Sequence, residues 1–171
     1  MENGVSMTYH NTPNLTDEVT LALRAITEKR AATIAYMLDE AKRYGLDDRH
    51  ARDAIAHYGR DNGRKMVSQM QNPNDIHEFA AIFTAGLESK VYEMQPISLT
   101  DNEFIVHFHY CPYVNKWLEQ EKAPDEIHQL CDICMEGDNA ITDAFPNLMF
   151  VLGNTIAKGG AVCELCYKKR S

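Results

Sequence analysis

The stretch FIVHFHYCP, which begins at Phe104, places two histidines and a cysteine at every second position. Successive side chains of an extended chain point to opposite faces, so His107, His109 and Cys111 would line one face of a strand. The hydrophobic residues between them would lie on the other face: Val106, Phe108 and Tyr110. A thiol beside a histidine can act as a nucleophile, with the histidine as general base. The row therefore indicates nucleophilic chemistry, unless it is only the solvated face of the strand.

A second group of reactive residues lies in the stretch CDICMEGD. Ile127, Cys131, Cys134 and Asp138 are spaced four, three and four apart, which places them on one face of a helix. A helix packed on the sheet would then direct two thiols and a carboxylate toward it. Two structural alternatives stay open. The cysteines would be small core residues, or Asp138 would cap a helix that starts after Gly137.

Metal binding is the other chemistry that the cysteines suggest. Cys131/Cys134 and Cys163/Cys166 are two C-x-x-C pairs, a spacing typical of zinc sites. The first pair shares a helix face, whereas the second lies on a predicted strand and points to opposite faces. This geometry disfavours a four-cysteine zinc site. We therefore predict no cofactor, with a mixed zinc site of Cys111, Cys131, Cys163 and a histidine as the open alternative.

These residues must be positioned by the surrounding elements. Helical spacing is predicted in four segments of the first half: residues 16–44, 47–58, 64–70 and 76–87. From about residue 90 the pattern predicts two β-hairpins, the second turning at 158–160, separated by a helical stretch hinged at Gly137. The expected fold is one α+β domain, 1–171. Its mainly helical half, 1–88, packs on a small antiparallel sheet with a crossing helix, 89–171. The first 14 residues are expected to be loose.

Composition restricts the class of partner. The 171 residues carry a net charge of -8, which disfavours a nucleic-acid partner. The sequence contains no run of 18 apolar residues, so no membrane span is predicted. The first residues show no secretory signal. Five cysteines without an export signal favour reduced thiols in a cytoplasmic protein. A small-molecule substrate is therefore the expected partner, and a homo-oligomer stays open.

Three stretches carry an ordered set of motifs: HFHYCPYVNKWLEQ, EIHQLCDICMEGDNAI and FPNLMFVLGNTIAKGGAVCEL. They contain a Cys-Pro pair followed by a tryptophan, then Leu-Cys-Asp and Gly-Asp, then a closing Gly-x-x-x-Cys-Glu. From about Asp75 to Lys169 the chain resembles the L-2-amino-thiazoline-4-carboxylic acid hydrolase family. The resemblance implies a small cytoplasmic hydrolase that opens a carbon–nitrogen bond of a cyclic amidine. It also implies a set of site residues: Cys111, Cys131, Asp138 and Cys163.

The leading hypothesis is a hydrolase with a cysteine nucleophile, either Cys111 or Cys131. His107 or His109 would be the base, and Asp138 would orient that base or hold the protonated ring nitrogen. If three thiols converge, a zinc-bound water is a competing mechanism.

The remaining assignments are tied to the same motifs. Cys163, Trp117 and Asn139 are predicted to bind the substrate, while Cys134 and Cys166 are predicted to be packing residues. The alternative function is a non-catalytic module that binds a small ligand or a metal and senses it through its thiols.

Overall fold

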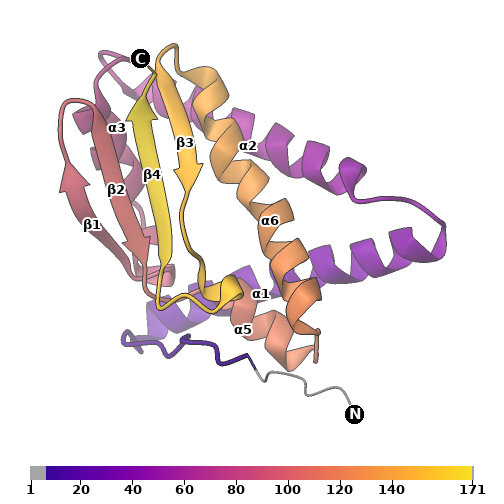
Figure 1. Ribbon diagram of the computed structural model, residues 1–171. Coiled ribbons are helices and arrows are strands. Elements are labelled where there is room, and N and C mark those ends of the chain that lie inside the picture. Colours follow the sequence, from indigo (N-terminus) through magenta and orange to yellow (C-terminus); the bar gives the residue numbers. More distant parts are fainter. Residues whose placement is uncertain (1–6, 171) are drawn as a thin grey trace.

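Four antiparallel strands form one sheet in the order β1-β2-β4-β3. Their bounds, in the computed structural model that describes residues 7–170, are β1 (Met94–Leu99), β2 (Glu103–Phe108), β3 (Leu148–Leu152) and β4 (Cys163–Lys169). The two predicted hairpins lie side by side, joined through β2 and β4 (Figure 1). The tight turn predicted at 158–160 is wrong, because the second hairpin is connected by the longer segment 153–162, which contains a 3-10 turn. Pro96 lies in the edge strand β1, where a residue without an N–H is tolerated.

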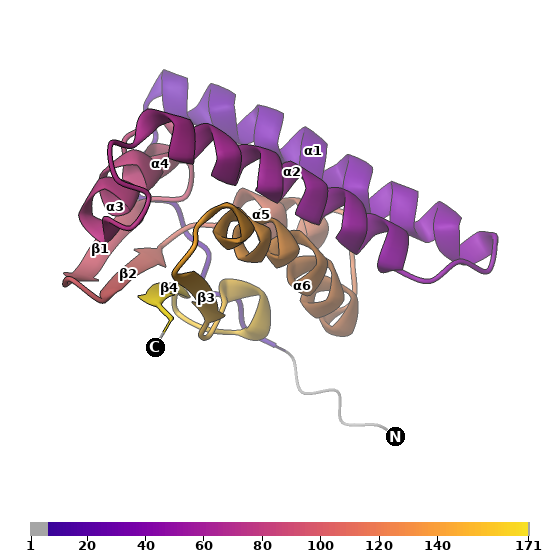
Figure 2. The same ribbon diagram turned by 90° about the horizontal axis from the view of Figure 1, so that it is seen from above.

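The helices cover one face of this sheet. They are α1 (Glu18–Arg43), α2 (Arg49–Gln69), α3 (Ile76–Thr84), α4 (Glu88–Val91), α5 (Pro112–Glu119) and α6 (Pro124–Ile141), with short 3-10 turns η1 (Thr142–Ala144) and η2 (Ile156–Lys158). Figure 2 shows α1 and α2 on the far side of α5 and α6 from the sheet. Phe104, Val106 and Phe108 of β2 are buried beneath the helices. The predicted α+β class is confirmed. No helix within residues 7–170 has both the length and the apolar composition needed to cross a membrane.

Two predicted helix boundaries are wrong for one shared reason. The second helix does not stop at Gly59, and the helix that crosses the sheet is not hinged at Gly137. A Cβ on Gly59 would lie 2.2 Å from the carbonyl oxygen of Gly137, and one on Gly63 would lie 2.3 Å from that of Ile141. The glycines therefore permit close contact between α2 and α6. Glycine is about 1 kcal/mol less favourable than alanine inside a helix, so tertiary packing overrides local propensity here.

The strand that carries His107 ends earlier than predicted. After Phe108 the N–H of His109 donates to the carbonyl of Tyr92, 3.1 Å away, and the chain leaves the sheet. Cys111 then caps α5, which begins at Pro112. Proline is favoured at the first helical position because its missing N–H would be unpaired there anyway. The short helix α5 was not predicted.

The N-terminal segment is held by contacts, against the expectation that it is loose. The side chain of Asn11 makes two hydrogen bonds to the backbone of Cys111, donating to its carbonyl at 2.9 Å and accepting from its N–H at 2.8 Å. The N–H of Leu15 donates to Glu93 at 2.8 Å, and Glu93 pairs with the buried Arg24. Asn11 is thus held at the start of α5, and Leu15 is held at Glu93, directly before β1. The first six residues lie outside the described part of the chain.

Candidate active site

One cavity of about 460 Å³, which we call the thiol cavity, is lined by four of the five cysteines. Cys111 lies at the start of α5, and Cys163 begins β4. Cys131, Cys134 and Asp138 reach the cavity from one face of α6, as their spacing predicted. Because α6 runs unbroken through Gly137, Asp138 does not cap a new helix. The fold brings together the four residues that the family resemblance implied.

The two histidines that precede Cys111 in the sequence do not line this cavity. Phe108 lines the thiol cavity together with Cys111, whereas His107 and His109 do not. His107 lies opposite Glu164 in the sheet, on the face away from the helices. The predicted row is therefore wrong at Cys111. Alternation of side chains holds only while the chain is extended, and β2 ends before Cys111 is reached.

The other predicted residues divide between the cavity and the surface. Trp117 lines the thiol cavity and is buried, and its indole N–H donates to the carbonyl of Ala31 at 3.1 Å. Asn139 is exposed and does not line the cavity. Cys166 points to the opposite sheet face from Cys163, as strand geometry predicted. Cys134 packs against the hydrophobic core and also lines the cavity.

Sequence reasoning missed the contribution of the N-terminal helices. Arg30 of α1, an exposed residue, lines the thiol cavity, and its guanidinium carbon lies 4.6 Å from the centre of the Tyr58 ring on α2. Tyr92 and Tyr113 add two phenols to the same lining. Local sequence gives no signal for Arg30, because an arginine in an amphipathic helix is usually on the solvated face.

The cavity thiols are protonated near neutral pH. Burial raises the pKa of Cys111 to about 11 and that of Cys131 to about 12. Burial also raises the pKa of the two other thiols well above the usual range: Cys134 and Cys163. At Cys111 the backbone N–H groups of Val114 and Tyr113 partly oppose this rise. A thiol here must lose its proton to a base before it can attack.

Asp138 is a carboxyl group of the cavity whose pKa lies near neutrality. Burial raises the pKa of its carboxyl group to about 6, while the Tyr167 hydroxyl, which donates to Oδ1 at 3.4 Å, and Arg30 oppose the rise. Within residues 7–170, no lysine, arginine or histidine forms an ion pair with Asp138. A pKa near neutrality suits a general base, since the group is ionised yet still able to hold a proton.

A ready-made metal site is not formed by these side chains. In the described part of the chain, no three His, Cys, Asp or Glu residues are arranged to hold an ion. Cys111, Cys131 and Cys163 share the cavity without forming a ligand set. Zinc binding remains a prediction that a metal analysis of the purified protein tests.

The sequence was compared with models of known protein families. A family model described as "L-2-amino-thiazoline-4-carboxylic acid hydrolase" matches residues 24–167. The chain belongs to this family. The family match begins within α1 and ends in β4, so it spans the thiol cavity from Arg30 to Cys163. It confirms the resemblance and extends it into the helical half. Family membership supports a hydrolase. A search of curated proteins finds no match.

Proposed function

We propose that this protein is a hydrolase that opens a carbon–nitrogen bond of a small cyclic amidine resembling 2-amino-thiazoline-4-carboxylate. Cys111 would be the nucleophile and Asp138 the general base. The observation that carries this proposal is that one cavity holds a thiol at a helix N-terminus and a carboxylate that has no ion pair among residues 7–170. Family membership supports the hydrolase class.

Cys111 is preferred to Cys131 on electrostatic grounds. Of the cavity thiols, Cys111 has the least elevated pKa, because the N–H groups of Val114 and Tyr113 favour its thiolate. The N-terminus of a helix also carries a partial positive charge that stabilises an anion. The Cys131 sulfur instead lies 3.9 Å from the Thr155 hydroxyl.

The proposed reaction has two stages. Asp138 accepts the thiol proton, and the sulfur of Cys111 attacks the amidine carbon. The ring carbon–nitrogen bond breaks, and the proton passes from Asp138 to the departing nitrogen, leaving the carbon bound to the enzyme sulfur. Water, deprotonated by Asp138, then attacks that carbon. The thiolate leaves and takes back the proton, and the ring-opened carbamoyl product is released.

The tyrosines of the cavity would bind the substrate. Burial raises the pKa of Tyr113 above its usual range and that of Tyr92 well above it. Both phenols therefore stay protonated and can donate hydrogen bonds to the developing charge. His107 and His109 have no role in this mechanism, because they lie outside the cavity.

Replacing Cys111 by serine tests the nucleophile. We expect Cys111→Ser to melt near the wild-type temperature but to lose at least about 1,000-fold in turnover of 2-amino-thiazoline-4-carboxylate, since a hydroxyl ionises far less readily than a thiol. Cys166→Ser is the matched control, because Cys166 lies on the opposite sheet face, and it should keep turnover within about twofold. Normal turnover in Cys111→Ser with loss in Cys131→Ser would transfer the role to Cys131.

Product analysis tests which bond breaks. Cleavage of the carbon–nitrogen bond gives a free amine and no new thiol, whereas cleavage of the carbon–sulfur bond would release a thiol that a thiol reagent detects. Stoichiometric zinc together with loss of activity on chelation would favour the metal-bound water instead.

A non-catalytic ligand-binding or thiol-sensing module is the second candidate. The raised pKa of all four cavity thiols favours it, since none is a ready thiolate. Binding of the heterocycle without any turnover by the wild type would identify this alternative.

A further inference from the structure

Arg30 differs from most arginines of the chain in lacking an anionic partner. The six arginines that form ion pairs with carboxylates are Arg24, Arg43, Arg49, Arg52, Arg60 and Arg64. Arg170 donates to the carbonyl of Leu148. Within residues 7–170, the guanidinium of Arg30 forms neither an ion pair nor a hydrogen bond, although it lines the thiol cavity. Its donors are free for a ligand.

The surroundings of Arg30 hold it in place and keep it charged. The guanidinium stacks on Tyr58 with 4.6 Å between its carbon and the ring centre, and this contact restricts the plane of its N–H groups. Burial lowers its pKa, but the phenols of Tyr113, Tyr58 and Tyr92 and the thiol of Cys134 together raise it above its usual value. Arg30 is thus an exposed, charged residue that lines the cavity containing the proposed nucleophile.

We propose that Arg30 binds the carboxylate of the substrate and makes the site selective for anionic heterocycles over neutral ones. A guanidinium matches a carboxylate with two parallel hydrogen bonds, which fixes orientation as well as charge. Arg30 is exposed, whereas burial raises the pKa of both Cys111 and Asp138. A substrate whose carboxylate meets Arg30 would therefore extend its ring inward, toward Cys111 and Asp138. This assignment rests on the proposed hydrolase function.

The volume of the cavity suits a small substrate, and its other charged residues define the competing contacts. About 460 Å³ is within the usual range for a small-molecule site. Two further charged residues line the cavity from α2 and α4: Lys65 and Glu88. Lys65 is the one alternative cation in the described lining. It is a point charge without the planar fork of arginine, so it would contribute attraction but little orientation.

The kinetic test compares an anionic and a neutral probe. Wild type, Arg30→Gln and the control Arg43→Gln are assayed with 2-amino-thiazoline-4-carboxylate and with its 4-carboxamide. Arg43 is a suitable control because it lies on the same helix, exposed, and pairs only with Glu40. Arg30→Gln should raise KM for the carboxylate by about 10- to 100-fold, change kcat less than about threefold and leave the carboxamide unaffected. Arg30→Lys should recover part of the loss, and Arg43→Gln should match the wild type.

Equilibrium binding separates this inference from the proposed reaction. Calorimetry with the same two probes measures affinity even if the protein turns over neither. Tighter binding of the carboxylate by the wild type, with that preference lost in Arg30→Gln at an unchanged melting temperature, supports the inference. A preference retained in Arg30→Gln, lost only in Lys65→Gln, or absent from the wild type overturns it. Absence of turnover with the preference intact would overturn the hydrolase function alone.

Discussion

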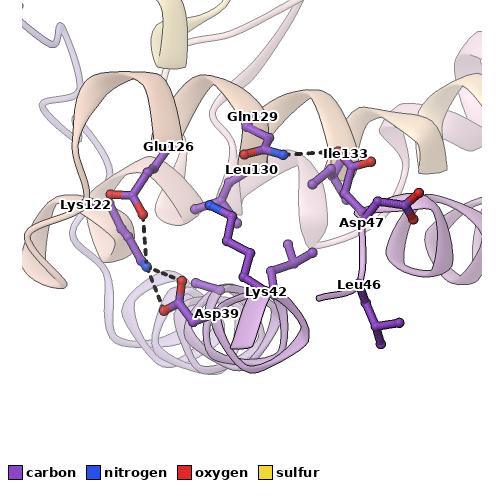
Figure 3. Close-up of a pocket in the computed structure, with 12 residues that line it drawn as sticks. Asp39, Lys42, Leu46, Asp47, Lys122, Glu126, Gln129, Leu130 and Ile133 are labelled. Carbon is purple, nitrogen blue, oxygen red and sulfur yellow. Dashed lines mark hydrogen bonds and ion pairs between the residues drawn. The ribbon is translucent and has the colours of Figure 1, made fainter. Parts of the chain in front are cut away.

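Two cavities of this fold share α1 and α6 as walls but differ in how their charges are balanced. The smaller, of about 190 Å³, we call the charged cavity (Figure 3). There Lys122 lies 2.7 Å from both carboxylate oxygens of Asp39 and 3.5 Å from Glu126. In the thiol cavity, within residues 7–170, neither Asp138 nor Arg30 forms an ion pair.

The difference shows what each cavity can do. Desolvating a charge is unfavourable unless a partner compensates it. In the charged cavity the chain supplies that partner, so Lys122 and Asp39 join α1 to the start of α6. In the thiol cavity the carboxyl group of Asp138 has no such partner, which raises its pKa, and the exposed Arg30 has no anionic partner among residues 7–170. A ligand that satisfies these groups gains binding energy there.

Replacing the aspartate of each cavity by asparagine should show which cavity takes part in catalysis. Asp138→Asn should lower kcat/KM by about 100- to 10,000-fold, because an amide cannot accept the proton. Asp39→Asn should leave kcat/KM within about threefold. In the wild type, kcat/KM should rise with pH through about 6, where Asp138 loses its proton, and then level off. The measurement is a pH–rate profile from acid to neutral pH.

Two results would contradict the catalytic distinction. One is an unchanged rise of kcat/KM with pH in Asp138→Asn. The other is an equal loss of activity in Asp39→Asn.

Moving α2 should affect the thiol cavity more than the charged one, since α2 lines only the former. Gly59→Ala places a methyl group 2.2 Å from the carbonyl oxygen of Gly137, so α2 must shift away from α6. We expect a loss of about 1–3 kcal/mol in the free energy of unfolding, measured in urea. His57→Ala, on the exposed face of the same helix, should change it by less than about 0.5 kcal/mol. Equal stability of the two variants would show that the helix contact is not tight.

The smallest expected effect is on stability. Replacing the carboxylate by an amide should change the free energy of unfolding in opposite directions in the two cavities. The folded-state pKa of Asp138, about 6, is above the ordinary 3.8, so a bound proton favours the folded state. That contribution is fully present below about pH 4 and is lost as pH rises through 6. Asp138→Asn should therefore increase the free energy of unfolding by about 1–2 kcal/mol at pH 7 and have little effect at pH 4. Asp39→Asn should decrease it by about 1 kcal/mol at pH 7, because its pair with Lys122 is broken.

Denaturant unfolding at the two pH values measures both variants. A decrease for Asp138→Asn at pH 7 would mean that its carboxylate is stabilised by the fold, as Asp39 is, and the comparison of the two cavities would fail.

Residue periodicity alone determined much of this molecule. The alternation of hydrophobic residues gave two hairpins, and the spacing of Cys131, Cys134 and Asp138 gave the helix face that lines the thiol cavity. The opposite orientations of Cys163 and Cys166 also followed from strand geometry. Such inferences hold because side-chain direction within a regular element depends only on neighbouring residues.

Only the tertiary structure decided where elements end and which charges lack partners. Cys111 left the histidine row because β2 ends at Phe108, and its backbone is held by Asn11, one hundred positions earlier in the chain. Gly59 continues a helix because Gly137 packs against it. Arg30 became a candidate ligand-binding residue because no carboxylate in the rest of residues 7–170 reaches it. Each outcome depends on groups distant in sequence, whose approach is set by packing of the whole chain and has no local signature.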